Sequence, residues 1–292
     1  TILDCTLGGG GHSKRLLEKF PDAKLYGIDR DRLALKAAAK RLKTYEEQTR
    51  LSQASFSELP TFFTKHGGPL FDYILADIGL SSEQLVRPER GFSFLQEGPL
   101  DMRMDPDRQQ ITAAYLVNNS SEHELLKILR NYGEGRFARK IVGTILAVRE
   151  TKPFETTSEL AELVGKVIPK RLQKQGFNPA TLTFQALRIA VNNELQELSV
   201  LLEQVPARLK PNGRLSIITF HSLEDRIVKH QFRKWENPCV CPTDLPYCIC
   251  GEKPLGRVLT RRPVKTSKNE VADNPRSRSA HLRVFALDKT AS

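Results

Sequence analysis

The chain has 292 residues and carries 45 Lys and Arg against 34 Asp and Glu, a formal net charge of +11. This length holds one large or two ordinary domains, each with its own core, and no apolar run approaches the roughly 20 residues of a membrane-spanning helix. A positive excess of this size suits a polyanionic partner such as nucleic acid.

The beginning of the chain predicts the first β-α-β unit of a doubly wound sheet. Residues 2–6 are strand-like, residues 13–20 have a helical pattern, and residues 24–29 form a second strand that ends in Asp29. Four consecutive glycines at residues 8–11 separate the first strand from the helix, and glycines there let the backbone pass close to a ligand. An acid that ends the second strand can bind ribose hydroxyls. We therefore expect a nucleoside-bearing cofactor.

The glycine spacing separates the candidate cofactors. A dinucleotide site requires G-x-G-x-x-G, but His12, Ser13 or Lys14 stands where each register needs a glycine. The G-x-x-x-x-G-K-S/T phosphate loop is absent as well. S-adenosylmethionine fits best because it has no pyrophosphate and carries a sulfonium and an amino acid. A nicotinamide oxidoreductase is the disfavoured alternative, and a flexible turn without a ligand is the simplest one.

Strand and helix patterns continue to alternate as far as Asp77. Asp31 can cap a helix that runs to residue 42, and further elements follow at residues 50–53, 56–59 and 70–77. The last of these is a strand, and it again ends in an acid. This alternation predicts a parallel sheet with helices on both faces. Residues 78–107 then lack a clear period, which in a compact domain indicates a functional loop.

Helical patterns dominate residues 112–209, with an apolar stripe at steps of three and four over residues 184–209. The α/β pattern then returns with a strand, a helix and two further strands, at residues 214–220, 223–235, 258–264 and 281–287. We therefore predict a sheet domain made of residues 1–105 and 198–292. An all-helical domain is inserted between them at residues 106–197.

Four of the five cysteines form a C-x-C-x6-C-x-C pattern: Cys239, Cys241, Cys248 and Cys250. Because no secretion signal is visible, thiolate ligands of a structural zinc are favoured over two disulfides, and unligated thiols are the third alternative. The cluster precedes a basic segment in which nine Lys and Arg lie between Lys253 and Arg283, against two acids. A basic run is commonly a solvated tail, but the position of this one between strand-like segments improves the case for contact with nucleic acid.

Several longer motifs resemble one enzyme family. The sequences DCTLGGGGHS, DIGLSSEQ, PLDMRMDP, NPATLTFQALRIAVNNEL, FHSLEDRIVK and NPRSRSAHLRV occur in this order along nearly the whole chain. They are similar to the ribosomal RNA small subunit methyltransferase H family, and the cysteine cluster resembles a cyanobacterial or plastid-like subset. The resemblance implies an α/β fold, a class I (Rossmann-like) S-adenosylmethionine-dependent methyltransferase sheet with an inserted all-helical domain.

The resemblance also implies an activity, that of an rRNA (cytosine-N4-)-methyltransferase. A methyl group is transferred from S-adenosylmethionine to the exocyclic N4 of one cytidine in the decoding region of 16S-type rRNA. The partner is the rRNA or the assembled small ribosomal subunit, not a membrane, and a homodimer is among the open oligomeric states. The enzyme works in the cytoplasm of a bacterium, or in a plastid or other organelle of a eukaryote. A non-catalytic RNA-binding factor of the same fold is the second alternative.

The family's site residues carry over position by position. Its cofactor contacts fall on Gly10, Gly11, His12, Asp29, Phe56, Asp77 and Gln84. The chemistry agrees, because Asp29 suits a ribose diol, Phe56 offers a ring to adenine, and Asp77 suits a methionyl amino group. The chain departs from the family at Asn178 and Leu182, where His and Arg are customary, and this departure removes one cation that could contact RNA.

Methylation of a cytosine amine requires positioning more than a strong base, since the N4 proton becomes acidic only as the new bond forms. Asp77 is the predicted acceptor for that proton, and a main-chain carbonyl within residues 77–82 is the main rival. Ser81 adds a neutral donor and acceptor, while His221 and Asp101 are expected to position the cytidine. The base must leave its stack to reach the methyl group.

Overall fold

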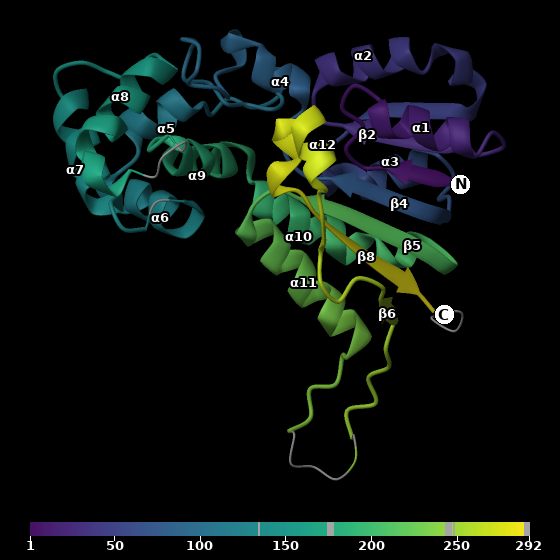
Figure 1. Ribbon diagram of the computed structural model, residues 1–292. Coiled ribbons are helices and arrows are strands. Elements are labelled where there is room, and N and C mark those ends of the chain that lie inside the picture. The colour runs from purple at the N-terminus through teal and green to yellow at the C-terminus, as the bar shows by residue number, and fades with distance from the viewer. Residues whose placement is uncertain (134, 174–177, 243–246, 248, 289–292) are drawn as a thin grey trace. The chain divides into compact units, whose positions relative to one another are not determined.

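The computed structural model describes residues 1–133, 135–173, 178–242, 247 and 249–288. The chain forms two compact units. Figure 1 shows the chain coloured by residue number. We call the two units the sheet unit, made of Thr1–Gly79 together with Leu195–Ser292, and the helical unit, made of Leu80–Glu194.

These limits differ from the predicted domain boundaries at residues 105/106 and 197/198. The hydrophobic core of the helical unit supplies the physical reason. Phe92, Leu100, Met102 and Met104 are buried in that core, although they lie in the loop that lacks a sequence period. The loop therefore belongs with the helices that follow it.

The sheet unit contains one mixed β-sheet. Its strands are β1 (Ile2–Asp4), β2 (Leu25–Asp29), β3 (Thr49–Gln53), β4 (Phe71–Asp77), β5 (Leu209–Thr219), β6 (Gly256–Val258), β7 (Val264–Lys265) and β8 (His281–Leu287). The order is β3-β2-β1-β4-β5-β8-β6, with β7 also paired to β8. Strands β1 to β5 are parallel, while β8 runs antiparallel to its neighbours. This topology confirms the predicted class I sheet, whose strand order reverses between β1 and β4.

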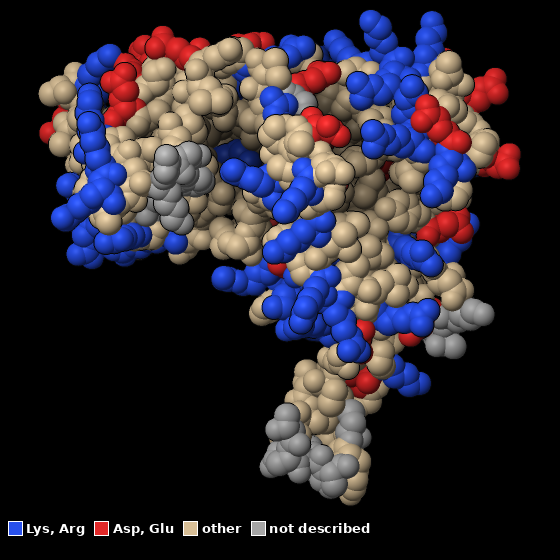
Figure 2. Space-filling view, viewed as in Figure 1, with Lys and Arg blue, Asp and Glu red and all other residues tan. Residues whose placement is uncertain are grey.

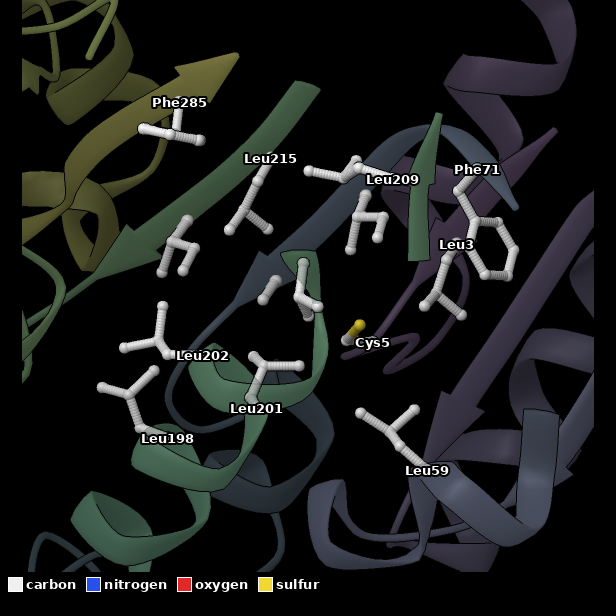
Figure 3. Close-up of a cluster of buried hydrophobic side chains, with 14 of the residues drawn as sticks. Leu3, Cys5, Leu59, Phe71, Leu198, Leu201, Leu202, Leu209, Leu215 and Phe285 are labelled. Atoms are coloured by element: carbon white, nitrogen blue, oxygen red, sulfur yellow. The ribbon is translucent and has the colours of Figure 1, made fainter. Parts of the chain in front are cut away.

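Helices cover both faces of this sheet. The helices of the unit are α1 (Gly11–Lys19), α2 (Arg32–Arg41), α3 (Leu59–Lys65), α10 (Glu194–Gln204), α11 (Ser222–Glu236) and α12 (Lys268–Asp273), with 3-10 turns at Lys43–Gln48, Phe56–Glu58, Pro206–Arg208 and Pro275–Ser279. Successive strand residues point to opposite faces, so Ile2 packs with α1 and α2, whereas Leu3 packs with α3, α10 and α11. Figure 3 shows the second of these cores, where leucines of α10 lie beside Leu215 of β5.

The helical unit is a bundle with its own core. Its helices are α4 (Ser82–Val86), α5 (Ala113–Asn119), α6 (Glu122–Tyr132), α7 (Ala138–Arg149), α8 (Thr157–Val167) and α9 (Thr181–Asn192), with 3-10 turns at Pro88–Arg90 and Lys170–Leu172. Capping boxes begin α6, at Ser121 and Glu124, and α8, at Thr156 and Glu159. Among the helices in the described ranges, none combines the length and apolar character needed to cross a lipid bilayer.

One buried asparagine joins the irregular segment to the bundle. The side chain of Asn192 accepts a hydrogen bond from Met104 N at 2.8 Å and donates to the carbonyls of Met102 and Arg188 at 2.8 and 2.9 Å. Met102 has a φ of 64°, a conformation that costs a residue other than glycine free energy. Asn192 therefore holds a strained turn in place.

Replacing Asn192 with leucine is expected to lower the free energy of unfolding by about 2–5 kcal/mol, because buried backbone groups lose their partners. Denaturant unfolding followed by circular dichroism measures the change. The matched control is Asn119→Leu, since Asn119 is exposed at the end of α5 and bonds only within its own helix. A loss below about 1 kcal/mol for Asn192→Leu contradicts the role given to this side chain.

Candidate active site

Three adjacent strands of the sheet unit end in a carboxylate. Asp4 is the last residue of β1, Asp29 of β2 and Asp77 of β4. Strand β1 lies between the other two and is parallel to both, so the three acids share one edge of the sheet. The carboxyl edge at a reversal of strand order is where open α/β sheets bind ligands.

The glycine loop crosses this edge and is fastened to β2. Gly8 N donates to Oδ2 of Asp29 at 2.7 Å, and Leu7 N donates to the carbonyl of Ile28 at 3.0 Å. Gly8 and Gly10 have φ values of 51° and 77°, in the left-handed region that favours glycine. A Cβ on Gly10 would lie 3.3 Å from Ala38. Gly10 is the N-cap of α1 without a side-chain cap, so the first amides of that helix remain available to a ligand.

Asp29 organises the loop through both carboxylate oxygens. Oδ2 accepts the bond from Gly8, and Oδ1 accepts a hydrogen bond from Asp31 N at 2.8 Å. Burial raises the pKa of Asp29 from 3.8 to about 6, although the two backbone bonds act in the opposite direction. A donor from a ligand would favour the charged form of this carboxylate.

Asp77 is held by residues that follow β1. Its backbone N donates to Oγ1 of Thr6 at 2.6 Å, and its Oδ2 lies 3.2 Å from Nε2 of His12 at the start of α1. The hydrogen bond with Asp77 raises the pKa of His12 above 6.5. Oδ1 of Asp77 is buried, and no hydrogen-bond partner occurs for it within the described part of the chain. Leaving a buried carboxylate oxygen unsatisfied is costly, so this atom is suited to accept a donor from a ligand.

Sequence reasoning gave no role to Asp4, although it lies beneath the site. Asp4 is buried, its Oδ2 accepts a hydrogen bond from the hydroxyl of Ser13 at 2.7 Å, and its Oδ1 accepts one from Thr6 N at 3.1 Å. Burial raises its pKa. Asp4 thus connects the end of β1 to α1 and to the turn that supports Asp77. The signal that could have found it is the one used for Asp29 and Asp77, an acid that ends an apolar strand.

Phe56 lies just after β3, in a turn closed by a capping box between Ser55 and Glu58. Its half-buried ring packs against the core of the sheet unit. The turn is also tied to α10, because Ser57 N donates to Glu197 at 3.0 Å. The structure therefore places Phe56 on the same edge of the sheet as Asp29.

His221 lies at the end of β5, where it caps α11. Its Nδ1 accepts a hydrogen bond from Glu224 N at 3.4 Å, and Oε2 of Glu224 accepts bonds from Phe220 N and His221 N at 2.8 and 3.3 Å. Nε2 of His221 lies 3.0 Å from Oε1 of Glu224, but these two atoms lack hydrogen-bond geometry. Capping explains much of the orientation of His221, and its Nε2 is buried against the Glu224 carboxylate.

Three predicted residues belong to the helical unit. Ser81 and Gln84 form the capping box of α4, in which Gln84 N donates to Ser81 Oγ at 3.2 Å and Ser81 N donates to Gln84 Oε1 at 3.0 Å. Asp101 forms a bidentate ion pair with Arg103 at 2.8 and 2.6 Å. These side chains thus have structural partners within their own unit.

The cysteine cluster follows α11. The sulfur atoms of Cys239, Cys241 and Cys250 lie within 4.8 Å of one another, and those of Cys239 and Cys250 are 3.8 Å apart. Ile249 N donates to the sulfur of Cys241 at 3.4 Å. Cys248, the fourth predicted ligand, lies outside the described residues. The fold therefore brings three of the four predicted thiols together.

Comparison with known proteins gives relatives along nearly the whole chain. A protein called ribosomal RNA small subunit methyltransferase H from Symbiobacterium thermophilum is 48% identical over 284 residues, which cover 97% of this chain and 89% of the relative. The protein of the same name from Pelobacter propionicus is 50% identical over 283 residues, covering 96% of this chain and 90% of the relative. A solved rRNA methylase from Streptococcus thermophilus is 10% identical over 98% of this chain and 86% of its own, with a TM-score of 0.41.

The model of the MraW methylase family matches residues 1–288. This match covers both segments of the sheet unit and the whole helical unit, including the glycine loop and the three strand-end acids. With such a match and with relatives about half identical over most of their length, the chain belongs to the MraW methylase family.

Proposed function

We propose that this protein transfers a methyl group from S-adenosylmethionine to the exocyclic N4 of one cytidine in the decoding region of small-subunit rRNA. The observation that carries the proposal is the set of acids that end β1, β2 and β4 around a glycine loop. Membership in a methylase family favours a methyl donor over a nicotinamide cofactor at this edge of the sheet.

The residues present fit the methyl donor. Gly8 and Gly10 give the loop the left-handed backbone that keeps it close to the sheet edge, Asp29 would hold the ribose hydroxyls, and Phe56 would contact adenine. Asp77 has a buried oxygen without a partner in the described ranges and suits the methionyl amino group or the substrate amine. When bound, S-adenosylmethionine supplies the methyl group. Gly11, His12 and Gln84 complete the proposed set of cofactor contacts.

The protein's contribution to the reaction is positioning and proton acceptance. As the new N4–carbon bond forms, the carbon–sulfur bond breaks, and the N4 proton passes to an acceptor. Asp77 is the proposed acceptor, and His12 orients it through the 3.2 Å contact to Oδ2. This arrangement favours the charge that develops on the amine without requiring a strong base. Ser81, Asp101 and His221 are the proposed residues for positioning the cytidine.

The substrate class is proposed from the relatives and from charge. The relatives are called ribosomal RNA small subunit methyltransferases, and this chain has a net charge of +11. Neutralising phosphates with Lys and Arg releases counterions and stabilises an RNA complex. Such an enzyme acts where ribosomes are assembled, in the bacterial cytoplasm or in an organelle of a eukaryote, on free rRNA or on the assembled subunit.

Single-turnover methylation of small subunits from cells that lack the protein tests the proposal. We expect mass spectrometry of the digested rRNA to show N4-methylcytidine at one position in the decoding region. Calorimetry should show binding of S-adenosylhomocysteine and none of NAD. Methylation of a different base, or of no rRNA at all, would overturn the proposed substrate.

We also propose that the cysteine cluster binds one structural zinc ion. Zinc–thiolate bonds of about 2.3 Å in a tetrahedral site place neighbouring sulfurs roughly 3.8 Å apart. The 3.8 Å between Cys239 and Cys250 fits such a site, and Cys241 lies close enough to join it. Cys248 would supply the fourth thiolate.

Purified protein is expected to contain one zinc ion per chain by elemental analysis, and Cys239→Ser combined with Cys250→Ser is expected to abolish it. Cys5→Ala is the matched control, because Cys5 is buried in the sheet core and should not affect zinc content. A protein without zinc but with four titratable thiols in the cluster would contradict the metal site.

A further inference from the structure

A second surface of the sheet unit has features of an RNA-binding groove. A cavity of about 630 Å³ lies between the carboxyl-terminal half of α11, residues 237–240 and Val258 at the end of β6. Its lining includes five basic residues, of which Arg283 is paired with Asp225. The other four are Lys229, Arg233, Lys234 and Arg261. We call this cavity the basic groove. Figure 2 shows Lys and Arg side chains gathered over α11.

The positive charge of the basic groove is only partly neutralised by the acids beside it. Glu236 lines it and brings one negative charge, and its Oε1 accepts a hydrogen bond from Val258 N at 2.8 Å. The nearby Asp225 forms a bidentate pair with Arg283 at 2.7 and 2.9 Å. Across the ranges that the structure describes, no ion pair involves any of the four basic side chains. The groove therefore presents four cations to solvent, which favours a polyanion.

The floor of the basic groove is rigid, and its rim is partly apolar. Phe232 is buried and stacks on Trp235 with ring centroids 5.5 Å apart. Trp235 O accepts a hydrogen bond from Leu255 N at 2.9 Å, which fixes the end of α11 to the segment that leads into β6. At the rim, the side chain of Val240 is 78% exposed. Cations on a fixed scaffold bind phosphates, and an exposed apolar side chain can contact a nucleobase.

The groove is separate from the proposed methyl-transfer site. His221 caps the amino end of α11, and Arg233 lies twelve residues further along the same helix. A rise of about 1.5 Å per residue places the two roughly 18 Å apart along the helix axis. A nucleic acid held in the groove is therefore contacted some distance from the base that receives the methyl group.

We infer that the basic groove binds the sugar-phosphate backbone of rRNA outside the target cytidine and anchors the substrate to the sheet unit. This inference rests on the proposed function for the identity of the RNA. Phosphate contacts position a nucleic acid without reading its sequence. The groove should therefore contribute to RNA affinity and to KM, and not to the rate of the bound complex.

The test compares two quadruple variants that remove the same charge. The groove variant is Lys229→Gln, Arg233→Gln, Lys234→Gln and Arg261→Gln. The control variant is Lys19→Gln, Lys24→Gln, Lys43→Gln and Lys65→Gln, four exposed side chains near the opposite ends of the parallel strands. The probe is a protein-free 16S rRNA fragment that contains the decoding region. Its Kd is measured by filter binding between roughly 50 and 200 mM salt, where phosphate contacts are strongly salt-dependent.

The groove variant should reduce the slope of log affinity against log salt by about 3, since each lost phosphate contact removes roughly 0.7–0.9. The control variant should change that slope by less than about 1. For methylation of small subunits, the groove variant should raise KM at least about tenfold while kcat stays within about twofold. Its affinity for S-adenosylhomocysteine in calorimetry should equal that of the wild type.

Equal slopes for the two variants would overturn the inference, because the effect would then come from the net charge of the molecule. The inference would also be overturned if the groove variant bound the protein-free fragment normally but bound the assembled subunit more weakly. That result would identify a ribosomal protein as the partner that binds the basic groove. Failure of the proposed function can be distinguished from failure of this inference, because the wild-type protein would then methylate no rRNA. The two salt slopes still test the groove in that case.

Discussion

Asp77→Asn is expected to lower the single-turnover rate of methyl transfer by roughly 100-fold or more, a size typical of losing a positioned proton acceptor. The amide keeps the shape of the side chain, but its nitrogen cannot accept the N4 proton. RNA affinity should change little, because Asp77 lies at the end of β4, where it contacts Thr6 and His12. It is not part of the basic groove. Rapid-quench methylation at saturating cofactor measures the rate, and filter binding measures the affinity.

Asp72→Asn is the matched control for this experiment. Asp72 lies in the same strand, is exposed, and pairs with Lys210 at the opposite end of β4. It should transfer methyl groups at the wild-type rate. A wild-type rate for Asp77→Asn itself would move the acceptor role to a main-chain carbonyl within residues 77–82 or to His221.

Asp29→Ala is expected to weaken binding of S-adenosylhomocysteine at least tenfold. A hydrogen bond to a charged group contributes about 1.5–3 kcal/mol, and the ribose hydroxyls lose this acceptor. The glycine loop also loses the bond from Gly8 N to Asp29. Calorimetry measures the affinity, with Asp22→Ala, an exposed acid in the turn before β2, as the control. Unchanged affinity in a folded Asp29→Ala protein would refute the ribose role.

The raised pKa of Asp29 also predicts a pH dependence with a definite sign. The folded protein without cofactor takes up the Asp29 proton at about pH 6, whereas an unfolded chain takes it up near pH 3.9. The contribution of Asp29 to the free energy of unfolding therefore falls as pH rises from about 4 to about 6. In its proposed ribose role Asp29 binds the cofactor as a carboxylate, so the affinity for S-adenosylhomocysteine should fall below about pH 6 and stay constant above it. Calorimetry from pH 5 to 8 checks this, and an equally steep fall in Asp29→Asn would assign it to another group.

The sheet and the residues of its proposed cofactor edge could be predicted from the sequence because their signals are local. Each signal spans only a few residues. Two of them are apolar strands that end in Asp29 and Asp77, and the third is a run of glycines before a helix. The resemblance then assigned roles to those residues. The predicted strand over residues 258–264 was wrong in detail, since β6 and β7 are two short strands that both pair with β8. Their division follows from pairing with a distant strand, which local sequence does not encode.

The apolar stripe over residues 184–209 shows another limit of sequence reasoning. The stripe continues through Asn193, but that residue has a φ of 50° and separates α9 from α10. Phe184 is buried in the helical unit, whereas Leu198 is buried in the sheet unit. Both helices need an apolar face, so the spacing of apolar residues is the same on either side of the break. Only the two cores show where one unit ends.

The sequence by itself determined the family, the parallel strands of the sheet, and the acids and glycines of the proposed cofactor edge, because each depends on residues that are close in the chain. The tertiary structure decided the partners of those residues. His12 contacts Asp77 across 65 positions, and Gly8 contacts Asp29 across 21. It also gathered Lys229 and Arg261 around one cavity. Hydrogen bonds and burial at these places depend on how distant segments pack, and a pattern of residue types along the chain carries no such distances.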